Sequence, residues 1–227
     1  MSVGNEFPGS CQPGEYVHAA CMLGHCDLIA QLINTGADPS AGSRFGTPLD
    51  IACRNGKLDV IRLLHTSGVD LHPDDKEIWD SAIYIACQNG HHDIVQYILS
   101  SKPELLSHRT EGFADGCMLF YEACEHGWLS IVKLLTEKGV DINAMVCVRD
   151  GSLSLPLDAA CTNGSYALVD YLMLQNIEIP RAIVEKHPHM FVPAFQRYID
   201  NIFSYVCVSF EESLLTTCPA YHFNGMN

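Results

Sequence analysis

This sequence has few basic residues and no long apolar run. Its 227 residues contain 13 Lys and Arg against 27 Asp and Glu, which gives a formal net charge of -14. A surface of that sign repels the phosphates of nucleic acids and of anionic membranes. No apolar run approaches the ~20 residues needed to cross a bilayer. We therefore expect no nucleic-acid partner and no membrane insertion, and a soluble protein that attracts basic protein segments.

A secretory signal is also missing from the start of the sequence. The first 20 residues contain neither a basic segment nor the apolar segment that follows it in a signal peptide. The 11 cysteines lie largely within apolar periodic segments, where a thiol behaves as a small hydrophobic group. An odd number of cysteines needs no pairing in a reducing compartment. We therefore place the protein in the cytoplasm, with the nucleus as an additional compartment.

Motifs typical of metal and catalytic sites are absent from the sequence. It contains no C-x-x-C pair, no H-E-x-x-H, no P-loop lysine pattern and no G-x-G-x-x-G. Its regularly spaced cysteines stand one repeat apart, and packed helices lie ~10 Å apart. That separation is too large for thiolates that must each lie ~2.3 Å from one zinc ion. We expect no catalytic, cofactor or metal site, and no enzyme activity.

The sequence does contain an internal repeat. The pattern Ala-Cys-x-x-Gly occurs five times, and its successive glycines are 32, 34, 37 and 37 residues apart. After these glycines, apolar residues recur at the i, i+3 and i+4 spacing of a helix. The five copies begin at Ala20, Ala52, Ala86, Ala123 and Ala160. Each unit is therefore predicted to be a helix, a tight turn, a second helix and a longer loop.

Residues at the ends of these predicted helices support the same interpretation. In the second copy, Thr47 can cap the first helix through its hydroxyl group, and Pro48 suits its first turn. Gly56 then ends that helix, where a left-handed conformation is needed. Gly68 ends the second helix of the same copy.

A unit of ~33 residues with the pattern T-P-L-x-x-A, then G-x-x-x-V-x-x-L-L, then G-A-D resembles the ankyrin repeat. The copy from Ser43 to His72 matches best. The resemblance implies an all-α fold, an ankyrin-repeat solenoid of about five helix-turn-helix units with a helical C-terminal cap. Neighbouring units would bury each other's apolar faces.

The predicted boundaries follow from the repeat and from the apolar spacing beyond it. Phe195, Tyr198, Ile199 and Ile202 recur at helical spacing, which predicts an amphipathic cap helix beginning after Pro193. The segments are a flexible N-terminus (1-13), an ankyrin-repeat domain (14-180) with repeats at about 14-42, 43-73, 74-110, 111-147 and 148-180, a C-terminal helical cap (181-207) and a loose tail (208-227).

The chain departs from the ankyrin pattern at the histidine that follows T-P-L. In the family this histidine helps to tie neighbouring repeats through hydrogen bonds. Of the five copies only the first keeps it, as His18, and the others have Asp50, Tyr84, Tyr121 and Asp158. A tyrosine can replace it by burying its ring while its hydroxyl keeps a polar contact.

The resemblance also indicates where a partner protein would bind. Ankyrin proteins usually bind on the concave side, through the hairpin tips and the end of each first helix. Candidates at the helix ends are Met22, Leu23, Arg54, Asn55, Gln88, Asn89, Glu125, His126, Thr162 and Asn163, and those at the hairpins are Arg44, Phe45, Trp79 and Phe113. Trp79 and Phe113 could instead pack over their own loops.

The long segment from Lys102 to Gly116 is a further candidate contact, or simply an insertion. Asn143 matches the loop asparagine that can be hydroxylated in ankyrin proteins. Its alternative role is a turn residue whose side chain bonds its own backbone.

The predicted function is a non-catalytic protein-protein interaction module, or scaffold, that binds an unidentified partner protein as a monomer. Two alternatives stay open: a substrate-recognition adaptor of a ubiquitin ligase, or the regulatory ankyrin segment of a larger signalling enzyme. An adaptor would carry a recruitment motif after its repeats. The segment Ser213–Pro219 is too short and degenerate to identify one.

Overall fold

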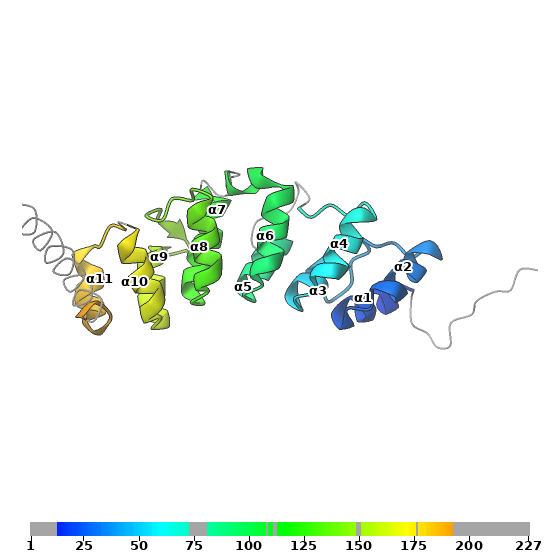
Figure 1. Ribbon diagram of the computed structural model, residues 1–227, viewed down its shortest axis with the longest axis horizontal. Helices are drawn as coiled ribbons and strands as arrows, with labels where there is room; N and C mark the ends of the chain where they lie inside the picture. Colours follow the sequence, from blue (N-terminus) through cyan, green and yellow to red (C-terminus); the bar gives the residue numbers. More distant parts are fainter. Residues whose placement is uncertain are drawn as a thin grey trace, which may run out of the picture.

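A computed structural model describes residues 13–72, 81–107, 109–110, 113–148, 151–175 and 177–192. Within these ranges, helices follow one another in pairs stacked in a single row (Figure 1). The first helix of each pair contacts the first helix of the next. The pairs are α1 (Pro13–Leu23) with α2 (Cys26–Asn34), α3 (Pro48–Arg54) with α4 (Leu58–Thr66), α5 (Ala82–Gln88) with α6 (His92–Ser101), α7 (Asp115–Glu125) with α8 (Leu129–Glu137), and α9 (Pro156–Asn163) with α10 (Tyr166–Leu174). The all-α solenoid of five helix pairs is confirmed.

The second pair shows how the sequence starts a helix. The Thr47 side chain accepts a hydrogen bond from the Asp50 backbone N–H at 3.2 Å, and the Asp50 carboxylate accepts one from the Thr47 N–H at 2.8 Å. This reciprocal pair is a capping box, with Pro48 at the first helical position. Asp50 stands where the ankyrin pattern has histidine, so its side chain serves its own helix start.

A glycine in the left-handed conformation separates the two helices of every described pair. The φ angles of these glycines lie between +67° and +84°. Residues with a Cβ rarely adopt such angles, which explains why glycine recurs there. The five turn glycines are Gly24, Gly56, Gly90, Gly127 and Gly164.

Two of the loops between pairs contain short antiparallel hairpins. The first joins β1 (Arg109–Thr110) to β2 (Phe113–Ala114), and the second joins β3 (Val146–Cys147) to β4 (Leu153–Ser154). The loop that begins at Lys102 also forms a 3-10 helix, η2 (Pro103–Leu106), whose Leu105 is buried. Part of this loop is therefore packed onto the solenoid.

A short helix follows the fifth pair. In this helix, α11 (Arg181–Lys186), Lys186 Nζ lies 2.9 and 2.8 Å from the two carboxylate oxygens of Asp158. His187 Nε2 lies 3.0 Å from the same carboxylate, and Ile183 is buried. Asp158, at another consensus histidine position, therefore connects α9 to the segment that follows the repeats.

The helix predicted after Pro193 lies outside the described residues, as do the predicted tail (208-227) and nearly all of the predicted N-terminal segment. Within the described ranges, no helix has both the length and the apolar character needed to cross a membrane.

The five cysteines of the Ala-Cys pattern form part of the core. Their exposed fractions are between 0% and 2%, which confirms that they serve as small apolar residues. Burial, with a smaller contribution from Cys26, raises the pKa of Cys21 to about 12. Burial, followed by the charge of Asp158, raises the pKa of Cys161 to about 11. Burial also raises the pKa values of Cys87 and Cys124.

The raised pKa values predict that the buried cysteine thiols react slowly with alkylating reagents. In native protein at pH 8, iodoacetamide should modify Cys21 roughly 100-fold more slowly than the half-buried Cys147, because only the thiolate reacts. Mass spectrometry of digested samples taken over time measures both rates. In guanidinium chloride the two cysteines should react alike, and equal rates in the native protein would contradict the prediction.

Candidate protein-binding surface

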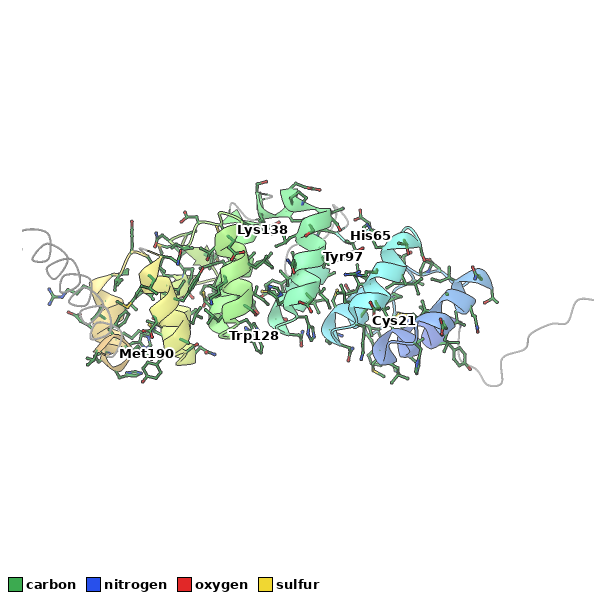
Figure 2. The ribbon with its side chains drawn as sticks, viewed as in Figure 1. Cys21, His65, Tyr97, Trp128, Lys138 and Met190 are labelled. Atoms are coloured by element: carbon green, nitrogen blue, oxygen red, sulfur yellow. The ribbon has the colours of Figure 1, made fainter. Side chains whose placement is uncertain are left out.

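The last two residues before each turn glycine form a row along one edge of the solenoid. We call this the turn-edge row, and its pairs are Met22-Leu23, Arg54-Asn55, Gln88-Asn89, Glu125-His126 and Thr162-Asn163. Figure 2 shows the position of this edge through Trp128, which follows one turn glycine, while Lys138 lies at the opposite edge. The row is exposed except at Gln88, which is half-buried.

The second residue in three of these pairs bonds to its own helix. The side-chain amide of Asn55 donates to the Ile51 carbonyl at 2.8 Å, and that of Asn89 donates to the Ile85 carbonyl at 2.8 Å. His126 Nδ1 lies 3.1 Å from the Glu122 carbonyl oxygen. These side chains close the ends of their helices, so a partner would meet them with at least one polar group already engaged.

The first residue of each pair varies in chemistry along the row. It is apolar in Met22, positive in Arg54, neutral in Gln88, negative in Glu125 and neutral again in Thr162. The Thr162 hydroxyl donates to the Asp158 carbonyl at 2.8 Å. The charge along the row therefore changes from positive at Arg54 to negative at Glu125.

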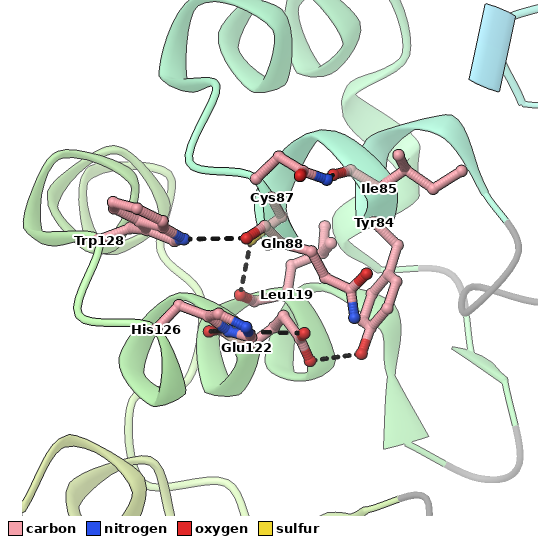
Figure 3. A network of polar contacts seen from close by, with 9 residues as sticks. Tyr84, Ile85, Cys87, Gln88, Leu119, Glu122, His126 and Trp128 are labelled. Carbon is pink, nitrogen blue, oxygen red and sulfur yellow. Dashed lines mark hydrogen bonds and ion pairs between the residues drawn. The ribbon is translucent and has the colours of Figure 1, made fainter. Parts of the chain in front are cut away.

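The residue after a turn glycine reaches back to the preceding repeat. His91 Nε2 lies 3.2 Å from the Arg54 carbonyl oxygen, and Trp128 Nε1 donates to the Gln88 carbonyl at 3.2 Å (Figure 3). A Cβ added to Gly90 would lie 2.8 Å from the Trp128 ring. The Trp128 ring thus packs on the neighbouring turn, and the residue is 37% exposed.

A buried polar network lies behind this part of the row. The Tyr84 hydroxyl donates to the Glu122 carboxylate, whose side chain is 5% exposed, and His126 Nδ1 lies 3.6 Å from the same carboxylate (Figure 3). The expectation that tyrosine buries its ring and keeps a polar contact is confirmed for Tyr84, which is 1% exposed. Sequence reasoning missed Glu122. The signal for it was an acid inside an otherwise apolar helical stretch.

Glu122, Glu125 and His126 also come close enough to suggest a metal site. One ligand atom from each lies within 4.8 Å of the others. The Glu122 carboxylate, however, is already bonded to Tyr84 and paired with His126. These internal contacts at the end of α7 account for the cluster, so we assign no metal site to it.

A groove lies between the first and second repeats, and we call it the hairpin groove. Its volume is about 910 Å³, and its lining includes Met22 of α1, Ile51 and Arg54 of α3, and Arg44 and Phe45 of the intervening hairpin. The Phe45 side chain is exposed, with the Arg44 guanidinium carbon 4.6 Å from its ring centre. Arg54 Nη1 donates to the Phe45 carbonyl at 3.3 Å, which fixes the base of the hairpin.

The structure therefore brings together five of the candidate residues predicted from the sequence. The hairpin groove is lined by Met22, Arg44, Phe45, Arg54 and Asn55. Leu23 is not part of its lining, and the other candidates at the helix ends lie at later turns of the row. Trp79 lies outside the described residues, and only the backbone of Phe113, in β2, is described.

Asn143 makes a contact that differs from the one expected. Its side-chain oxygen accepts a hydrogen bond from the backbone N–H of Glu178 at 2.8 Å, 35 residues further along the chain. The local turn is closed instead by Asp141, whose carboxylate accepts from the Asn143 N–H at 2.9 Å. Asn143 therefore connects successive loops, and its hydroxylation stays a prediction.

Comparison with protein families agrees with this architecture. A model described as "Ankyrin repeats (3 copies)" matches residues 17–109 and again residues 84–182. The two matches overlap by about one repeat, as five copies require, and together they span well over half of the 227 residues. Ankyrin repeats are protein-protein interaction modules. The chain therefore belongs to the ankyrin-repeat family.

Proposed function

We propose that this chain is a non-catalytic interaction module that binds a partner protein through the hairpin groove and the turn-edge row. The hairpin groove is the observation that carries this proposal. It combines an exposed aromatic ring with two arginines, and aromatic residues and arginine are the side chains most often found as anchors of protein interfaces.

The chemistry of the described residues supports a role without catalysis. Burial raises the pKa values of Cys87 and Cys124, whereas a cysteine nucleophile needs a lowered pKa. The buried network of Tyr84, Glu122 and His126 is explained by the packing of α5 against α7, and the contact of Asp158 with His187 joins α9 to the segment that follows the repeats. Buried thiols also suit the reducing cytoplasm, where we propose that the protein acts as a monomer.

Affinity capture tests the proposal. The tagged full chain is used to recover partners from lysate and is compared with a Phe45→Ala/Arg54→Ala variant. Partners recovered specifically should fall at least about tenfold with this variant, since loss of interface anchors costs about 2 kcal/mol or more. Quantitative mass spectrometry measures recovery, and thermal unfolding monitors the fold.

The matched control is Arg181→Ala, because the Arg181 side chain is 91% exposed on α11, away from the groove. It should leave recovery unchanged. Equal recovery with wild type, control and the groove variant would show that partners do not use this surface.

A further inference from the structure

The hairpin groove has the charge opposite to that of the chain as a whole. The chain carries a formal net charge of -14, yet two guanidinium groups, Arg44 and Arg54, line this groove. Among the described residues neither arginine has a carboxylate within ion-pair distance. The nearby Asp50 is 6% exposed and serves the capping box of α3. Both arginines thus retain donors for an added carboxylate, which guanidinium groups bind in a bidentate manner.

Apolar side chains line the same groove as these charges. Met22 is 50% exposed and Phe45 is 58% exposed. The Arg44 guanidinium lies against the Phe45 ring, which orients the charge at the edge of the groove. A ligand that fits both features has an apolar side chain next to a carboxylate.

The turn-edge row would fix the orientation of a bound segment, because its charge differs between the two ends of the stretch from Arg54 to Glu125. Arg54 of the second pair is followed by half-buried Gln88 in the third and by exposed Glu125 in the fourth. Repeats stack ~10 Å apart, so Arg54 and Glu125 are separated by roughly 20 Å along the row. An extended chain covers that distance in about six residues, at ~3.3–3.6 Å for each residue.

We propose that the partner contributes an extended segment in which an apolar residue adjoins Asp or Glu, and a Lys or Arg follows about six residues away. The apolar residue occupies the hairpin groove beside Met22 and Phe45. The carboxylate pairs with Arg44 and Arg54, and the basic residue lies opposite Glu125. This inference rests on the proposed function, because it names the chemistry of the partner that the groove and the row would bind.

Selection from random peptides tests the inference without knowledge of the natural partner. A display library of random twelve-residue peptides is panned against the immobilised full chain. The enriched peptides should share an apolar residue next to Asp or Glu, with Lys or Arg about six positions away. Enrichment of peptides without an acid, or the absence of any enrichment, would overturn the proposal.

Charge exchange then tests the assigned contacts. The most enriched peptide is labelled with fluorescein, and its affinity is measured by fluorescence polarisation. The Arg54→Glu chain should bind it at least about tenfold more weakly, whereas Arg181→Glu should bind it like wild type. A peptide with Lys in place of its acid should recover affinity for the Arg54→Glu chain. Equal binding by the wild-type and Arg54→Glu chains would overturn the assignment.

The two experiments distinguish a failure of this inference from a failure of the proposed function. If affinity capture depends on Phe45 and Arg54 but the selected peptides lack an acid, the chain binds proteins and the acidic-segment inference is wrong. If affinity capture recovers no partner that depends on the groove and panning enriches nothing, both proposals are wrong.

Discussion

Replacing Tyr84 with phenylalanine is expected to lower the free energy of unfolding by about 3 kcal/mol, because it leaves a buried carboxylate without its main donor. Tyr84 is 1% exposed, and its hydroxyl donates to Glu122, whose side chain is 5% exposed. His126, 3.6 Å away, is too exposed and too distant to replace that bond. Urea denaturation followed by circular dichroism measures the loss.

A second tyrosine provides the matched control. The hydroxyl of half-buried Tyr97 lies 2.9 Å from Nδ1 of His65, between α6 and α4 (Figure 2). Tyr97→Phe should cost only about 1 kcal/mol, because solvent can reach the groups that it leaves behind. Tyr84→Phe combined with Glu122→Met should regain most of the lost stability, since no buried charge is then left unpaired. A smaller loss for Tyr84→Phe than for Tyr97→Phe would contradict this account.

The fold was predictable from the sequence because each repeat signals its own boundaries. Thr47 and Pro48 start a helix, the turn glycines end one, and the buried cysteines mark the same point in every copy. These are local effects of backbone conformation and apolar spacing, and one copy reinforces the interpretation of the next.

Contacts between repeats were predictable only in part. The sequence indicates that Tyr84 replaces a histidine, but its partner Glu122 is 38 residues away, and nothing in the sequence pairs that acid with Tyr84. Asp50 and Asp158 occupy the same repeat position, yet one closes a capping box while the other binds Lys186. The same residue type therefore takes different roles, because the neighbouring repeat decides which groups it meets.

The candidate binding surface was also predictable only in part. The repeat pattern identified Arg44, Phe45, Arg54 and Asn55 one by one, and the structure places them around one groove. The pattern could not show that the Asn55 amide is used within its own helix, because that bond depends on the geometry of the helix end. Nor could it show that Arg44 lies against the ring of Phe45.

The turn glycine of the third pair, Gly90, also has a steric role. Gly90 has a φ of +73°, and a Cβ there would lie 2.8 Å from two carbon atoms of the Trp128 ring. The ring cannot withdraw without losing the hydrogen bond from its Nε1 to the Gln88 carbonyl. Glycine is therefore required at this position for two reasons. One is the left-handed backbone conformation, and the other is the close approach of the next repeat.

Gly90→Ala is accordingly expected to lower the free energy of unfolding by about 3 kcal/mol, of which about 1 kcal/mol comes from the left-handed backbone and the rest from overpacking. Gly164→Ala is the matched control, because Gly164 has a φ of +79° but no described atom within 4 Å of the added Cβ. It should cost only about 1 kcal/mol. Chemical denaturation of both variants measures the difference.

A double-mutant cycle then isolates the contact between the repeats. In a Trp128→Ala background, Gly90→Ala should cost only about 1 kcal/mol, since the ring that it meets is gone. The same substitution in the wild-type chain should cost about 2 kcal/mol more. If the cost of Gly90→Ala is the same in both backgrounds, the indole ring does not restrict this position, and the backbone conformation alone requires glycine.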